Sequence, residues 1–103
     1  MTDTPDRPLT VLLAGLGSMG AVWLRALASP EASALGVRLA AVCESDPDRG
    51  AAALAAAGVE VPHYTALDAA LDHGADILID CTTPNARMAI TAEALARGLH
   101  VLC

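Results

Sequence analysis

The sequence has no phenylalanine, and its 103 residues include only one tryptophan and one tyrosine. A hydrophobic core must therefore be built from aliphatic side chains and alanine, which suits helices packed closely on a parallel sheet. Positive charge is also scarce, with 6 Lys and Arg against 12 Asp and Glu. The net charge of −6 predicts no basic surface for nucleic acid or for an anionic membrane.

Long apolar runs are missing, since none reaches the roughly 18 to 20 residues that cross a bilayer. The polar stretch over residues 1–8 has no hydrophobic signal-peptide segment, so we expect a disordered lead there. One domain of a cytoplasmic protein should follow over residues 9–103. Cys43, Cys81 and Cys103 each end an apolar run without CxxC spacing, so we expect buried, reduced thiols and no metal site.

Gly15, Gly17 and Gly20 form a GxGxxG pattern between an apolar strand, Thr10–Ala14, and a helix expected over Ser18–Ala28. This arrangement is typical of a dinucleotide pyrophosphate site. The first glycine allows a tight turn, the second leaves room for the pyrophosphate, and the third lets the helix pack closely. Free amides in the first turn of the helix face the anion. We therefore predict dinucleotide binding at this turn.

An acidic residue, Glu44, follows the second apolar run, Leu39–Cys43, at about the distance from the glycines that dinucleotide sites use. Its carboxylate can accept hydrogen bonds from both hydroxyls of the adenosine ribose, and it would repel a 2′-phosphate. These properties favour NAD, whereas NADP stays an alternative if Arg49 turns back to bind the phosphate. The other interpretation of Glu44 is a solvated loop acid without a ligand.

Apolar runs alternate with helical patterns along the chain, which indicates an α/β fold: a three-layer, doubly wound parallel sheet of the Rossmann type. Pro62 cannot donate to a central ladder, so its strand should lie at an edge, as the strand order 3-2-1-4-5 requires. Asp46 with Pro47, and Thr65 with Asp68, are expected to cap helices. The later strands are expected at Val37–Cys43, Val59–Tyr64, Asp76–Cys81 and Leu99–Cys103, the later helices at 47–57, 66–73 and 85–97, and a connection at 29–36.

The turn after the fourth strand carries a second group of polar residues, Thr82, Thr83 and Asn85, next to Pro84. Strand carboxyl ends on either side of the first strand form the crevice where ligands bind in such sheets, so these groups should reach a nicotinamide ribose. The alternative is that Pro84 and Asn85 only start and cap the next helix. Asp80 is an acid in an apolar run; we expect it near the strand end with a hydrogen-bond partner, or else in contact with a ligand.

Three segments resemble one family: the glycine turn GLGSMG, the stretch AVCESDPDR, and TTPNARMAITAEALARGLHVLC. They are similar to the N-terminal part of the glucose-fructose oxidoreductase and inositol dehydrogenase family (Gfo/Idh/MocA), over about residues 9–103. The resemblance implies NAD(P)-dependent oxidation or reduction of sugars, cyclitols and related alcohols. It also implies cofactor contacts for Gly15, Leu16, Gly17, Ser18 and Met19 at the pyrophosphate, for Glu44 at the adenosine ribose, and for Thr83, Pro84 and Asn85 at the nicotinamide end.

The chain departs from that family in two respects. Members often carry a histidine where this chain has Met88, and they continue with a Glu-Lys-Pro triplet and a substrate domain where this sequence stops, at Cys103. We therefore assign no catalytic residue, and we expect a small-molecule substrate only together with that second domain. His63, His73 and His100 are expected to be structural or exposed.

Two further interpretations stay open. One is a stand-alone nucleotide-binding module without chemistry. The other is the cofactor domain of a neighbouring reductase, because Asp76–Pro84 is similar to dihydrodipicolinate reductases and the sequence GLHV at 98–101 to homoserine dehydrogenases. A sheet that ends with the strand Leu99–Cys103 has an unpaired apolar edge, so we also expect self-association through that edge.

Overall fold

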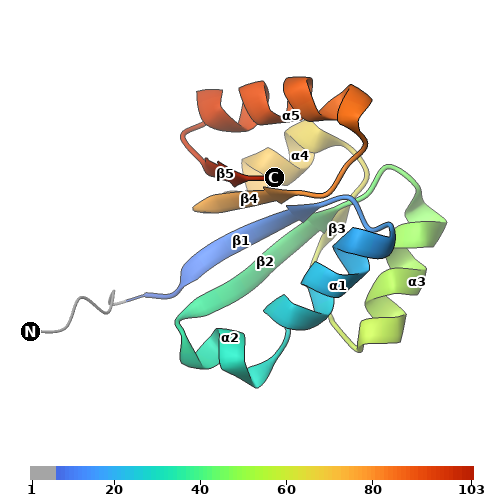
Figure 1. The fold of residues 1–103 in the computed structure, drawn as a ribbon, viewed down its shortest axis with the longest axis vertical. Helices are drawn as coiled ribbons and strands as arrows, with labels where there is room; N and C mark the ends of the chain where they lie inside the picture. The colour runs from blue at the N-terminus through green and yellow to red at the C-terminus, as the bar shows by residue number, and fades with distance from the viewer. Residues whose placement is uncertain (1–6) are drawn as a thin grey trace, which may run out of the picture.

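Five parallel strands form one sheet in the order β3-β2-β1-β4-β5, with helices on both faces (Figure 1). The computed structural model describes residues 7–103. The elements are β1 (Leu9–Ala14), α1 (Ser18–Leu27), α2 (Pro30–Ala34), β2 (Val37–Cys43), α3 (Pro47–Ala57), β3 (His63–Tyr64), α4 (Leu67–His73), β4 (Ile77–Asp80), α5 (Pro84–Ala96) and β5 (His100–Leu102). The predicted three-layer fold and strand order are confirmed.

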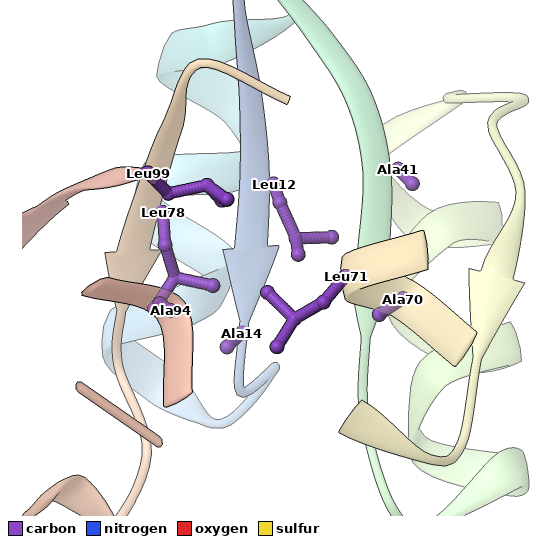
Figure 2. Close-up of a cluster of buried hydrophobic side chains, with 8 residues drawn as sticks. All are labelled: Leu12, Ala14, Ala41, Ala70, Leu71, Leu78, Ala94 and Leu99. Carbon is purple, nitrogen blue, oxygen red and sulfur yellow. The ribbon is translucent and has the colours of Figure 1, made fainter. Parts of the chain in front are cut away.

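Alternate residues of β1 point to opposite faces of the sheet and divide the core in two. Leu12 and Ala14 belong to the cluster under α4 and α5, where Figure 2 shows them near Leu71. Val11 and Leu13 belong to the cluster under α1 and α3. The buried members of both clusters are leucine, valine, isoleucine or alanine, as the shortage of aromatic residues predicts.

Helix α3 begins and ends where the sequence predicts. The Asp46 carboxylate accepts hydrogen bonds from the Asp48 and Arg49 amides, and Pro47 lies in the first turn. Gly58 ends the helix in the left-handed region, with φ of +67°. The cap satisfies amides that the first turn leaves without helical partners.

Three strands are shorter than predicted. β3 contains only His63 and Tyr64, because Pro62 has no N–H for the ladder, although its carbonyl accepts the Val42 amide. Among the described residues β3 pairs with β2 alone, which agrees with the predicted edge position. β4 and β5 each lose a residue at both ends of the predicted range.

The predicted start of α4 is wrong. The helix begins at Leu67 with Ala66 as its N-cap, and no side chain bonds to its first amides. The backbone stays extended through Ala66, one residue further than a cap by Thr65 would allow. Asp68 consequently lies in the first turn and not at the position that completes a capping box.

Two other helix starts also differ from the prediction. The segment 29–36, predicted only as a connection, contains α2, because the Ser29 hydroxyl accepts the Ala32 amide and a proline occupies the first helical position. Helix α5 begins at Pro84, so Asn85 lies inside the first turn and does not cap it.

At the amino-terminal end, residues 1–6 of the predicted lead lie outside the described residues. Arg7 pairs with Asp76, with Nη1 2.8 Å from Oδ2. The Asp76 carboxylate also accepts the amide and hydroxyl of Thr10, and so ties the start of β1 to the start of β4.

The cysteines only partly match their predicted burial. All three thiols are free; Cys43 and Cys81 are half-buried, whereas Cys103 is exposed beyond the edge strand β5. No helix within residues 7–103 has the length and apolar character of a membrane span.

Candidate functional site

A cavity of about 340 Å³ lies at the carboxyl ends of β1, β2 and β4. The strand order reverses at β1, so this is the switch point where open α/β sheets bind ligands. The lining residues are Ala14, Gly15, Gly17, Cys43, Glu44, Ser45, Arg49, Thr65, Leu67, Cys81, Thr82, Thr83, Ala86 and Ile90. A hollow of about 510 Å³ at the opposite end of β2, around Val37 and Arg38, contains none of the predicted site residues.

The three glycines of the β1–α1 turn meet different constraints. Gly15 has φ of +88°, and a Cβ there would lie 2.7 Å from the Cys81 carbonyl oxygen. A Cβ on Gly20 would overlap the Gly15 carbonyl oxygen. A Cβ on Gly17 would meet no atom within 4 Å, because this glycine faces open space beside the cavity. Gly15 and Gly20 are therefore required by the fold, whereas the fold places no steric demand on Gly17.

Helix α1 presents free amides beside Gly17. Gly17 is its N-cap and has no side chain to bond to the first turn. The amides of Ser18, Met19 and Gly20 also lack helical partners, as the first amides of any helix do. Positive potential at the helix start therefore remains available to an anion.

The Glu44 carboxylate is buried, with 5% of the residue exposed. Oε1 accepts the Leu16 amide at 2.9 Å, and Oε2 accepts the Asp46 amide at 2.9 Å. Burial raises the pKa of this carboxyl, but these two hydrogen bonds and the nearby charge of Arg49 outweigh it and bring the pKa below its ordinary value. Glu44 is thus a fixed anion in the cavity wall, and its interpretation as a solvated loop acid is wrong.

Glu44 keeps acceptor capacity for a ligand. Each carboxylate oxygen can accept two hydrogen bonds. The Leu16 and Asp46 amides each use one site, and the Ser45 hydroxyl lies at a long 3.5 Å from Oε2. One acceptor site on each oxygen is then left for a donor in the cavity. The same carboxylate can therefore brace the glycine turn and hold a diol.

Two further residues, Arg49 and His63, contact Glu44. Arg49 Nη1 lies 3.9 Å from Oε1, and this side chain is largely exposed. His63 Nε2 lies 3.1 Å from the Glu44 carbonyl oxygen, to which it can donate. A Cβ on Gly50 would overlap the His63 ring, so glycine in α3 makes room for this contact. The prediction that His63 is structural agrees with this placement.

The β4–α5 turn forms the other wall. Thr82 and Thr83 line the cavity, as predicted. Asp80 is 3% exposed, and its Oδ1 accepts both the amide and the hydroxyl of Thr82. Arg87 Nη2 donates to the Thr82 carbonyl oxygen at 3.2 Å. The expectation that Asp80 lies at the strand end with a hydrogen-bond partner is confirmed.

The structure brings some predicted residues together and leaves others apart. Gly15, Gly17, Glu44, Thr82 and Thr83 share the cavity wall. The remaining predicted residues lie elsewhere: Leu16 has its side chain in the core, Gly20 is buried, Ser18 is exposed, Met19 lines a neighbouring cavity, and Pro84 and Asn85 are exposed on α5.

Several lining residues were not predicted. Cys43 is the last residue of β2, Cys81 directly follows the end of β4, and Thr65 and Leu67 follow the edge strand β3. Their position at strand carboxyl ends was the available signal. Ala86 and Ile90 carry no polar group, so only their place on α5 reveals them.

Comparisons with known proteins agree with this geometry. The family model described as "Homoserine dehydrogenase, NAD binding domain" matches residues 15–103. Inositol 2-dehydrogenase of Leifsonia xyli subsp. xyli (strain CTCB07) is 38% identical over 104 residues, which cover 100% of this chain and 29% of that protein.

Two solved structures share the fold. The WlbA dehydrogenase from Chromobacterium violaceum, in complex with NADH and UDP-GlcNAcA, has a TM-score of 0.79 and 29% identity over 93% of this chain and 27% of that chain. An oxidoreductase from Agrobacterium radiobacter, in complex with NAD+, L-tartaric acid and magnesium, has a TM-score of 0.79 and 26% identity over 92% of this chain and 27% of that chain.

Fold, site and family model together define an NAD-binding domain of the Rossmann type, and the chain belongs to the NAD-binding domain family of homoserine dehydrogenase. Its relatives include an inositol dehydrogenase and a WlbA dehydrogenase, which confirms the resemblance to the N-terminal part of Gfo/Idh/MocA proteins. The chain spans only 29% of the inositol dehydrogenase.

Proposed function

We propose that this domain binds NAD across the carboxyl edge of the sheet, with the pyrophosphate at Gly17 and the adenosine ribose at Glu44. One observation carries the proposal: a glycine facing open space, an uncapped helix start and a buried carboxylate meet at one cavity. Free amides suit an anion, and a carboxylate suits a diol, so the wall matches the two chemically different parts of a dinucleotide.

The nicotinamide half would then extend past the β4–α5 turn. Thr82 lines both the main cavity and a neighbouring cavity that also contains Met19 and Arg87. Polar groups of Thr82 and Thr83 would contact the second ribose there. Pro84 and Asn85 would contribute through the start of α5, at the entrance to this region.

The site favours NAD over NADP. The Glu44 carboxylate, with its lowered pKa, repels a 2′-phosphate at neutral pH. Arg49 lies beside this carboxylate, and binding a phosphate would require it to leave Glu44. The Glu44 carboxylate is held by the Leu16 and Asp46 amides, whereas the Arg49 side chain is largely exposed. The fixed charge next to the proposed ribose position is therefore negative.

For the whole protein we propose an NAD-dependent dehydrogenase of sugar- or cyclitol-type alcohols in the cytoplasm. Support comes from the inositol dehydrogenase and WlbA relatives. When bound, the nicotinamide exchanges a hydride with the substrate. Residues of this chain hold and orient the cofactor, and we assign none of them a role in proton transfer.

Two alternatives have their own tests. The name of the matching family model favours a homoserine-dehydrogenase-like reductase, which assays of the full-length protein with cyclitols and with homoserine would distinguish. A stand-alone module without chemistry would bind NAD but oxidise neither substrate.

The first test is calorimetric titration of NAD and NADP, oxidised and reduced, into this chain and its Glu44→Ala variant. We expect NAD to bind more tightly than NADP, and Glu44→Ala to weaken NAD about 10- to 100-fold through the lost charged acceptor. Glu60→Ala, at an exposed acid, is the matched control. A folded wild-type chain that binds neither cofactor would refute the proposal.

A further inference from the structure

Asp80 occupies a buried position at which an apolar side chain would be less unfavourable for the free energy of folding. It ends the buried strand β4, next to Ile79, and is 3% exposed. Its Oδ2 atom has no partner among the described residues. A buried carboxyl group with one unsatisfied oxygen is unfavourable, so fold stability alone gives no account of an acid here.

The other oxygen of Asp80 determines what Thr82 can do. Asp80 Oδ1 accepts the Thr82 amide at 2.9 Å and also the Thr82 hydroxyl. A hydroxyl has one hydrogen, and Thr82 donates it to Asp80. Toward a ligand, Thr82 Oγ1 can therefore only accept a hydrogen bond.

Arg87 holds the backbone carbonyl of Thr82 in place. Its Nη2 donates to the Thr82 carbonyl oxygen at 3.2 Å. The amide, hydroxyl and carbonyl of Thr82 are then all held by side chains at the edge of the cofactor cavity. Thr82 is prepared for a ligand before any ligand arrives, which lowers the entropy cost of binding.

We propose that Asp80 is a positioning residue, which makes Thr82 Oγ1 a fixed acceptor for a hydroxyl of the nicotinamide ribose. This inference rests on the proposed binding of NAD and adds a specificity rule to it. The site selects a hydrogen-bond donor at this point and disfavours a phosphate oxygen or a carbonyl, which would face the lone pairs of Thr82.

Three ligands locate the contact: ADP lacks the second ribose, ADP-ribose contains it, and NAD adds the nicotinamide. We expect Thr82→Val and Asp80→Leu each to lower the affinity for NAD and ADP-ribose about 3- to 10-fold, which is the effect of one hydrogen bond. The affinity for ADP should not change. Loss of folding would weaken all three ligands together. The double variant should be no weaker than Thr82→Val alone, because both changes remove one contact.

Conservative variants sharpen the test. Thr82→Ser keeps the hydroxyl, and Asp80→Asn keeps an acceptor oxygen, so both should retain most of the ADP-ribose affinity. Asp76→Asn changes an acid at the other end of the same strand region and should not alter the ratio of ADP-ribose to ADP affinity.

The outcomes separate this inference from the proposed function. Wild-type protein that binds no NAD would refute NAD binding itself. Wild-type protein that binds NAD, with Thr82→Val weakening ADP-ribose binding while Asp80→Leu keeps full ADP-ribose affinity, would overturn the role of Asp80 alone. Weakening of NAD without weakening of ADP-ribose would overturn the ribose assignment as well.

Discussion

At the scale of single residues, the glycine turn separates what folding requires from what binding requires. Gly20→Ala forces a Cβ into the Gly15 carbonyl oxygen, so we expect a loss of stability of about 1 to 3 kcal/mol. In Gly17→Ala the added Cβ meets no atom within 4 Å, so we expect a loss of stability of only about 0.5 to 1 kcal/mol from the poorer N-cap. NAD binding should nevertheless weaken, because the methyl group would occupy the proposed pyrophosphate position.

Urea unfolding and NAD titration of both variants check this prediction. The expected pattern is opposite in the two measurements: Gly20→Ala is mainly less stable, and Gly17→Ala mainly binds less. A Gly17→Ala protein with wild-type NAD affinity would contradict the pyrophosphate assignment.

The sequence predicted the sterically special residues better than their partners. Gly15, Gly20 and the Asp46 cap follow from local patterns, which the structure reproduces. The bond from the Leu16 amide to Glu44 joins residues 28 positions apart, and no local pattern contains it. That contact decides how many acceptor sites Glu44 keeps. The sequence therefore identified Glu44 as a candidate ligand-binding acid but not as a hydrogen-bond partner of the glycine turn.

At the scale of elements, hydrophobic runs predicted all five strands, because periodicity is a local property of the sequence. The strand order came from the dinucleotide-binding fold, with Pro62 placing β3 at an edge. Helix starts were less predictable. Thr65 fits a cap in sequence, but the backbone stays extended through Ala66 beside the β2–β3 ladder, where the Glu44 amide donates to the Tyr64 carbonyl. The pairing of β2 with β3 thus places the start of α4 one residue later than the local sequence predicts, and helix propensity contains no information on that pairing.

The ends of β1 and β4 are joined by a charge contact whose strength depends on pH. The Arg7 hydrogen bond and the Thr10 amide hold the pKa of Asp76 well below its usual range. A carboxyl with a lowered folded-state pKa adds stability above its unfolded pKa of about 4, and this stability is lost as pH falls. We expect Asp76→Asn to lower Tm at pH 7 and the difference from wild type to shrink progressively below about pH 4.

Thermal unfolding followed by circular dichroism at several pH values measures this effect. Glu60→Gln, at an exposed acid, should match wild type throughout. A Tm difference for Asp76→Asn that stays constant down to pH 2 would exclude the Arg7 and Thr10 contacts as its origin.

At the scale of the whole molecule, β5 is an edge strand of the sheet within residues 7–103. In that part of the chain β5 pairs with β4 alone, and Leu102 is 48% exposed. Met88 and Leu95 of α5 are exposed as well. An unpaired apolar edge favours pairing with another chain, so we expect this 103-residue chain to associate as its concentration rises.

Light scattering coupled to size exclusion over a hundredfold concentration range tests this association. Leu102→Lys places a charge on the edge and should shift the chain toward monomer. Leu35→Lys, at an exposed leucine outside the sheet, is the matched control and should behave as wild type. A wild-type chain that stays monomeric throughout would contradict the prediction.

The contact between His63 and Gly50 has an evolutionary consequence. The imidazole fills the volume that any side chain at position 50 would need, so position 50 cannot gain a side chain while this ring stays in place. A lineage that gains a larger residue at position 50 must shrink or move the residue at position 63, and the Glu44 carbonyl then loses its donor. Aligned relatives should therefore show correlated substitution at these two positions, with the ring present only where glycine faces it.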